Sequence, residues 1–170
     1  MKITAQEEYG LRCLTRLARS PEQAATLPEI AAAEGLSAPY VAKLMGVLRH
    51  AGIIESTRGR SGGYRLAKPT TEIGLGSLLL VLGEPLFDEP SYCERHAGAA
   101  TNGNCVHHGA CSLRALWLTL EQWIRSSLDQ VTLADLLQSE GQIAELVRNR
   151  LAQGAVPVPT HLIPLTTLSM

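Results

Sequence analysis

Aromatic side chains are scarce in this 170-residue sequence, which contains one Phe, two Trp and four Tyr. Hydrophobic residues nevertheless make up 45% of the chain, which is enough to build a core. Leu, Ala and Val must therefore fill most of that core. For a chain of this length we expect one domain with an accessory element.

Long hydrophobic runs are also missing. The longest aliphatic run is Leu78–Leu82, which is too short to cross a bilayer. The N-terminal sequence MKITAQEEYG carries two glutamates where a secretory signal would be apolar. We therefore expect a soluble cytoplasmic protein with no membrane partner. In a reducing cytoplasm, four cysteines favour metal, cluster or redox chemistry over a disulfide framework.

The net charge of −1 conceals an uneven distribution of charge. Residues 36–71 contain six Lys or Arg and a single acid, Glu55, whereas the rest of the chain has nine basic and fifteen acidic residues. A basic segment in an otherwise acidic chain is typical of binding to an anion, most often a nucleic acid. A solvated charged face is the alternative. The motifs within the segment are needed to choose between this interpretation and nucleic-acid binding.

The spacing of Thr4 and Glu7 is that of a capping box and predicts a helix over about residues 5–19. Residues 28–52, PEIAAAEGLSAPYVAKLMGVLRHAG, have the pattern of a helix, a glycine turn and a second helix capped by Ser37. This pattern predicts a helix–turn–helix, whose second helix presents its N-terminal turns to base edges. The candidate DNA-binding residues there are Ser37, Pro39, Tyr40 and Lys43, although Lys43 could contact phosphate instead.

Two short β-rich runs, residues 53–57 and 64–66, flank a glycine-rich turn and predict a two-stranded hairpin. Residues 20–25, before the helix–turn–helix, are expected to form a loop. A hairpin that directly follows a helix–turn–helix is the wing of a winged helix. A nucleotide-phosphate loop is the rival interpretation, but the Walker lysine and its helix are absent. The wing residues expected to contact DNA are Arg58, Arg60, Ser61, Gly62 and Arg65.

Three of the four cysteines lie in one polar stretch, CERHAGAATNGNCVHHGAC. Eleven residues separate Cys93 from Cys105 and five separate Cys105 from Cys111, so the segment could bring three thiolates to one centre. A plain surface loop with free or paired cysteines is the alternative. The fourth cysteine, Cys13, lies on the apolar stripe of the first predicted helix and is expected in the core.

An apolar stripe at helical spacing follows the last cysteine, in a long helix expected to be capped by Ser112. Such a helix needs a partner surface. A second copy of the chain is the economical one, and packing on the N-terminal domain is the alternative. The stripe consists of Leu113, Leu116, Trp117, Leu120, Trp123, Ile124 and Leu128.

The expected fold is mostly α with a small β-hairpin. A winged helix-turn-helix domain over residues 1–86 includes a short helix at 77–82. A cysteine-rich loop at 87–111 and a dimerisation helix at 112–131 follow. The last segment, 132–170, is expected to contain a helix start at Thr132, a helix through residues 143–151 and an irregular tail.

Together these segments resemble the family of winged-helix repressors that includes the iron-sulfur cluster regulator (IscR), the nitric-oxide-sensitive repressor (NsrR) and the cysteine-metabolism regulator (CymR). The resemblance covers about residues 1–137. The matching segments are MKIT with EYGLRCLTRLA, the helix–turn–helix and wing, EIGLGSLLLVLGEP, the cysteine stretch, and CSLRALW with VTLADLL. The resemblance implies a homodimer that binds a double-stranded DNA operator, without enzymatic activity or a small-molecule substrate.

The resemblance further implies an iron-sulfur cluster, with 2Fe-2S preferred over 4Fe-4S, and makes Cys93, Cys105 and Cys111 its thiolate ligands. The IscR-type histidine three residues after the last cysteine is replaced by Arg114. In NsrR-like members an acidic residue of the first helix, contributed by the other subunit, completes the site, and Glu8 is at the matching position. The alternatives for the fourth ligand are His107, His108 and His96, and Glu8 could instead form an i,i+4 ion pair with Arg12.

The leading interpretation is a DNA-binding repressor that senses iron-sulfur status, redox stress or nitric oxide through a cluster. A cluster-free repressor that senses oxidants through a reversible disulfide remains open. A zinc site with three Cys and one His also remains open. An iron-sulfur electron carrier is the alternative from another class, but it would leave the basic wing without a role.

Overall fold

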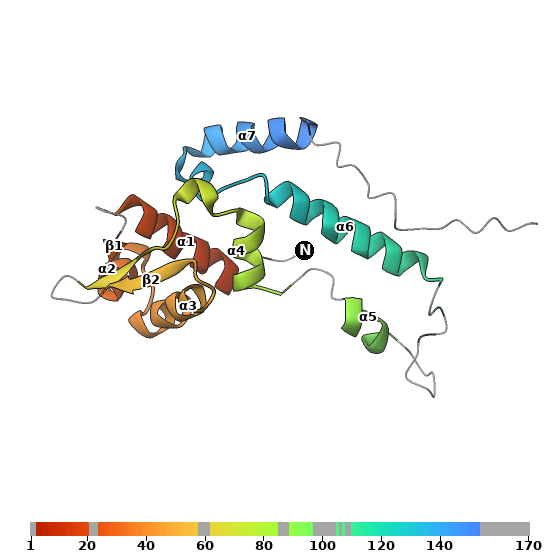
Figure 1. The fold of residues 1–170 in the computed structure, drawn as a ribbon, viewed down its shortest axis with the longest axis horizontal. Helices are drawn as coiled ribbons and strands as arrows, with labels where there is room; N and C mark the ends of the chain where they lie inside the picture. The colour runs from red at the N-terminus through yellow and green to blue at the C-terminus, as the bar shows by residue number, and fades with distance from the viewer. Residues whose placement is uncertain are drawn as a thin grey trace, which may run out of the picture.

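The computed structural model describes residues 3–20, 24–57, 62–84, 89–96, 105, 107 and 110–153. The fold is mostly helical with a small antiparallel sheet, as expected (Figure 1). The helices are α1 Ala5–Arg19, α2 Leu27–Glu34, α3 Ala38–His50, α4 Leu75–Leu82, α5 Glu89–Arg95, α6 Ser112–Leu128 and α7 Glu140–Gln153, with 3-10 turns η2 Thr70–Glu72 and η3 Asp135–Leu137. The strands are β1 Ala24–Ala25, β2 Ile54–Thr57 and β3 Gly63–Leu66.

Helix α1 begins and ends where its sequence predicts. Thr4 Oγ1 accepts a hydrogen bond from the Glu7 N–H at 3.2 Å, and the Glu7 carboxylate accepts one from the Thr4 N–H at 2.7 Å. This reciprocal capping box satisfies N–H groups that have no partner within the helix. The helix buries one face, including Cys13, Leu14 and Leu17, in the core.

The helix–turn–helix is formed by α2 and α3. Thr26 starts α2 with a second capping box, and Gly35 ends it with φ at +66°, a left-handed conformation that favours glycine. Ser37 occupies the N-cap position of α3 as predicted, but its side chain makes no capping hydrogen bond. The recognition helix therefore begins without the side-chain cap that the sequence suggested.

The wing belongs to a three-stranded sheet with the order β1-β3-β2, not to an isolated hairpin. The prediction of a loop before the helix–turn–helix was wrong at Ala24–Ala25, which pairs with β3 as β1. This pairing requires close approach, because a Cβ built on Gly63 would lie 2.6 Å from the Ala25 carbonyl oxygen. A strand of two residues is too short to show an alternating pattern in the sequence.

One hydrophobic core joins α1 through α4, the sheet and the segment after α6. Its fully buried large side chains include Leu14, Leu17, Ile30, Leu44, Met45, Leu48, Leu78 and Leu133. None is aromatic, as the composition implied. No helix in the part of the chain that the structure describes has the length and hydropathy needed to cross a membrane.

Helix α6 extends away from the winged domain toward α5, and α7 lies beside its other end (Figure 1). Its N-cap is Cys111 and not Ser112, because the Cys111 thiol accepts the Arg114 N–H at 3.4 Å. The helix start expected at Thr132 is one 3-10 turn, after which α7 is longer than the predicted 143–151. The predicted helix at 77–82 begins two residues earlier, at Leu75.

Candidate DNA-binding and cysteine sites

The residues nominated on the recognition helix lie at its N-terminal end. Ser37, Pro39 and Lys43 are exposed, whereas Tyr40 is half-buried. The Tyr40 ring meets the Tyr9 ring of α1 edge to face, with 6.0 Å between ring centroids and 87° between ring planes. Three of the four nominated side chains are thus available to a partner, and the fourth packs against α1.

The described part of the wing carries one nominated cation, Arg65, whose side chain is 55% exposed. Its Nε donates a hydrogen bond to the carboxylate of Glu55 at 2.6 Å, and the two residues are Cα partners across β2 and β3. The one acid of the basic segment therefore neutralises a wing arginine. Gly62 is half-buried, and Arg58, Arg60 and Ser61 lie outside the described residues.

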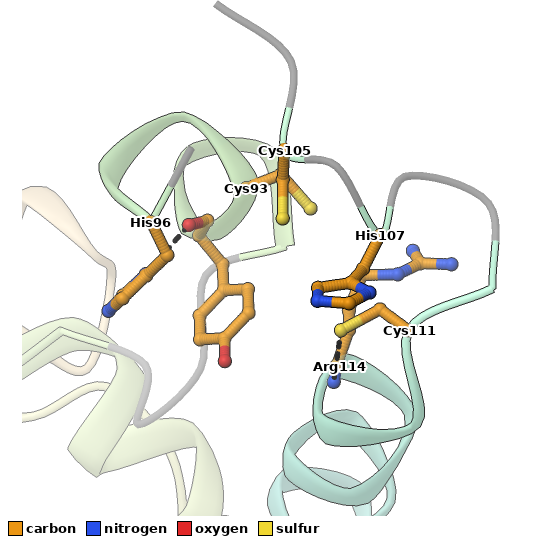
Figure 2. Close-up of a pocket in the computed structure, with 7 residues that line it drawn as sticks. Cys93, His96, Cys105, His107, Cys111 and Arg114 are labelled. Carbon is orange, nitrogen blue, oxygen red and sulfur yellow. Dashed lines mark hydrogen bonds between the residues drawn. The ribbon is translucent and has the colours of Figure 1, made fainter. Parts of the chain in front are cut away.

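A pocket of about 190 Å³ lies where α5 approaches the start of α6 (Figure 2). The cysteines nominated from the sequence, Cys93, Cys105 and Cys111, all line it, and all are free thiols of intermediate exposure. The other lining residues are Tyr92, His96, His107 and Arg114. His108, another candidate, lies outside the described residues.

The local structure at this pocket differs from the expected loop. Cys93 belongs to α5, a short helix that was not predicted from the sequence, and Cys111 is the N-cap of α6. Figure 2 shows the His107 ring directed toward Cys111, whereas the His96 ring points away from the three sulfur atoms. His96 Nδ1 lies 2.8 Å from the Tyr92 carbonyl oxygen, and the two rings stack at 4.4 Å between centroids.

The donor chemistry of the pocket suits a thiolate-bound cluster, since soft sulfur ligands are those of iron-sulfur centres. Its geometry is more open than a ligand sphere. Within the described residues, no three His, Cys, Asp or Glu side chains converge closely enough to hold a metal ion. The pocket thus collects the right donors without placing them at coordinating distance.

Glu8, the proposed fourth ligand, is exposed on α1 and does not line the cysteine pocket of its own chain. The i,i+4 ion pair considered for it is not formed. Arg12 instead donates to the Glu34 carboxylate at 2.9 Å, and this hydrogen bond, with weaker contributions that include Glu8, raises the pKa of Arg12. The Glu8 carboxylate is therefore accessible from outside the chain.

Helix α6 presents an apolar face to solvent. Its exposed members are Leu113 at 58%, Leu116 at 48%, Trp117 at 44%, Leu120 at 39% and Trp123 at 44%. Ile124 and Leu128, at the end nearer the winged domain, are half-buried. The five exposed side chains of the predicted stripe therefore do not pack on the winged domain of their own chain, contrary to the alternative raised by the sequence.

The chain is similar to known proteins over most of its length. Residues 3–139 match the Rrf2 family, described as an iron-dependent transcriptional regulator. The sequence is 37% identical over 152 residues to the HTH-type transcriptional regulator NsrR of Geobacillus kaustophilus, a match that covers 88% of this chain and 99% of that protein.

Solved structures show the same likeness. The structure of IscR from T. potens is similar with a TM-score of 0.61 and 31% identity, covering 81% of this chain and 86% of that one. The structure of CymR, the global cysteine regulator of B. subtilis, is similar with a TM-score of 0.61 and 29% identity, covering 81% and 96%. The chain is thus similar both to IscR and to CymR.

Proposed function

Because the chain belongs to the Rrf2 family of iron-dependent transcriptional regulators, we propose that it is a homodimeric repressor whose affinity for its operator is set by an iron-sulfur cluster. Family membership makes it a DNA-binding transcriptional regulator and not an enzyme. Membership also argues against an electron carrier. The operator, the cluster and the dimer are the parts that we propose.

For the DNA interface we propose the first turns of α3 and the wing. The exposure of Ser37, Pro39 and Lys43 at the start of α3 supports base-edge and phosphate contacts. Exposed Arg65 on β3 supports a phosphate contact beside the wing tip. The remaining proposed contacts are Tyr40, Arg58, Arg60, Ser61 and Gly62.

For the cofactor we propose Cys93, Cys105 and Cys111 as thiolate ligands. The single observation that carries this assignment is that three cysteines, with eleven and five residues between them in the sequence, line one pocket. Bound there, a cluster of either 2Fe-2S or 4Fe-4S type would supply a centre that reacts with oxidants or nitric oxide. The residues of the chain would hold it beside α6.

For the fourth ligand we propose Glu8 from a second subunit. Its carboxylate is exposed, and it is absent from the lining of its own chain's pocket, as an intersubunit ligand would be. His107, whose ring is directed toward Cys111, is the alternative within the described residues (Figure 2). His96 points away from the sulfur atoms, and His108 remains a candidate from the sequence alone.

Anaerobic purification and reconstitution test the cofactor assignment. The expected result is a coloured protein whose iron and sulfide contents match a cluster, and a colourless, iron-free Cys93→Ser/Cys105→Ser/Cys111→Ser variant. A colourless wild-type protein after reconstitution would contradict the assignment. Glu8→Gln is expected to alter the visible spectrum and shorten the lifetime of the cluster, whereas exposed Glu145→Gln on α7 is the charge-matched control.

A cluster-free thiol sensor is the second candidate function. Two observations favour it: the similarity to the structure of B. subtilis CymR, and the absence of three converging ligands in the described residues. Peroxide would then oxidise two pocket thiols to a disulfide and be reduced to water, changing DNA affinity without any iron. Mass analysis of the oxidised protein, together with iron and zinc contents, separates this sensor from a cluster and from a zinc site.

A further inference from the structure

The first turn of the recognition helix contacts α1 and lacks a side-chain cap. Ser37 makes no side-chain capping hydrogen bond, whereas α1 and α2 both have complete capping boxes. A helix that must present side chains to base edges needs a fixed starting orientation. The contacts that could fix it come from Tyr9 and Arg12 of α1.

Arg12 binds the end of α2 at two points. Its Nε donates to the Glu34 carboxylate at 2.9 Å, and its Nη2 donates to the Glu34 carbonyl oxygen at 2.8 Å. Glu34 is the last residue of α2, immediately before the left-handed Gly35 of the turn. One guanidinium therefore binds both the side chain and a terminal carbonyl at the point where the chain turns toward α3.

The same guanidinium lies over the Tyr9 ring, with 5.4 Å from Cζ to the ring centroid. Tyr9 in turn meets Tyr40, in the first turn of α3, edge to face at 6.0 Å and 87°. Both tyrosines are half-buried against the core. Glu34, Arg12, Tyr9 and Tyr40 thus form a continuous series of contacts from the end of α2 to the start of α3.

We propose that Tyr9 and Arg12 are positioning residues for sequence recognition, and that together they fix the turn and the first turn of the recognition helix. This inference rests on the proposed role of α3 in reading DNA. Neither residue needs to touch DNA. Their loss should therefore reduce discrimination between base sequences while leaving the sequence-independent attraction to phosphates unchanged.

The test uses two duplexes: one enriched by the wild-type protein from a random-sequence pool, and a shuffled version of it. Affinities are measured by fluorescence anisotropy at one salt concentration. We expect Tyr9→Leu and Arg12→Lys to bind the selected duplex about tenfold more weakly and the shuffled duplex within about twofold of wild type. Tyr9→Phe, which keeps the ring, should match wild type.

Arg12→Lys retains the charge, so electrostatic attraction is not altered. Arg16→Gln removes a charge from an exposed position of the same helix and should weaken binding to both duplexes equally. If Tyr9→Leu does not fold, Arg12→Lys decides alone. Unchanged discrimination in a folded Arg12→Lys variant, or equal losses on both duplexes, would overturn the inference. If the wild-type protein enriches no duplex, the proposed DNA interface itself is overturned. That outcome is distinct from failure of the positioning role alone, in which the wild-type protein still selects a duplex.

Discussion

Cys13 lies in the core of the winged domain, with none of its surface exposed. Burial raises the pKa of its thiol to about 11, with a smaller contribution from Glu34. The thiolate is the reactive form of cysteine, so Cys13 is inert near neutral pH. The three pocket cysteines, in contrast, are all of intermediate exposure.

Alkylation of the metal-free native protein with iodoacetamide at pH 8 should therefore modify Cys93, Cys105 and Cys111 and spare Cys13. Peptide mass spectrometry measures the modification site by site. In denaturant, all four cysteines should react, which provides the control for reagent access. Modification of Cys13 in the folded protein at the rate of the pocket thiols would contradict its assignment to the core.

Glu55 limits the positive charge that the wing would offer to DNA at the proposed interface. Its carboxylate accepts the Arg65 hydrogen bond at 2.6 Å on an exposed face of the sheet. Glu55→Gln should leave the positive charge of Arg65 unneutralised and so strengthen binding to random-sequence DNA. The slope of log affinity against log salt concentration should become steeper by about one. Salt titrations of binding measure the slope, and Glu145→Gln on α7 is the matched control. A slope equal to that of wild type would exclude this moderating role.

At the scale of elements, the sequence predicted those helix starts that are stabilised by interactions between neighbouring residues. The capping box at Thr4 identified the start of α1, because the box is complete within four residues. The strand β1 and the helix α5 were missed. The first depends on pairing with β3, far along the chain, and the second is only seven residues long.

The cysteine pocket was predicted in part. Spacing and the family resemblance nominated the three cysteines that line it, and the resemblance also marked position 114, but no pattern indicated that Tyr92 would line it too. Arg114 lies three residues after Cys111, a spacing that brings residues to one face of a helix, whereas Tyr92 lies directly before Cys93 on α5. Tyr92 could have been predicted in the lining only if α5 had been recognised as a helix. The polar composition of this stretch gave no helical pattern.

An ion pair between Arg150 of α7 and Asp135 holds α7 against the preceding segment of the chain. The carboxylate of Asp135, a buried residue, accepts hydrogen bonds from the Thr132 N–H and from Nη1 of Arg150 at 2.8 Å each. Burial acts to raise the pKa of Asp135, but these hydrogen bonds outweigh burial and lower it. The interaction is therefore strongest when the carboxylate is ionised.

Asp135→Asn should lower the free energy of unfolding by about 1–2 kcal/mol at pH 7, because a charge-assisted pair is lost. A lowered folded-state pKa contributes stability that is present above the unfolded value of about 3.9 and is lost as the pH falls through the folded value. The difference from wild type should therefore shrink below about pH 4. Urea unfolding at several pH values measures it, and a pH-independent difference would contradict this account.

At the scale of the whole molecule, α6 joins the cysteine pocket to the winged domain. Its first turn is capped by Cys111. Just beyond its other end, the Val131 carbonyl oxygen accepts the Leu75 N–H of α4 at 2.7 Å. A Cβ built on Gly76 would clash with the Asp129 side chain, so these two residues lie close together. A change at the pocket would thus reach the DNA-binding domain through one continuous helix.

The prediction of a dimer depends on the exposed apolar face of α6. Burying such side chains contributes about 1.5–3 kcal/mol each, so a glutamate within the face should prevent association. Trp117→Glu is expected to be a folded monomer by sedimentation, whereas Ser126→Glu, exposed and off the stripe, should remain dimeric. A dimeric Trp117→Glu protein would place the subunit contact elsewhere.

The central claim is that the state of the cysteine pocket sets affinity for DNA. The most direct measurement is the anaerobic dissociation constant for the selected duplex, with reductant present, of the cluster-reconstituted protein, the chelator-treated protein and the Cys93→Ser/Cys105→Ser/Cys111→Ser variant. We expect the first two to differ by at least about fivefold, and the variant to be unaffected by reconstitution. Equal affinities for the loaded and the stripped wild-type protein would contradict the claim.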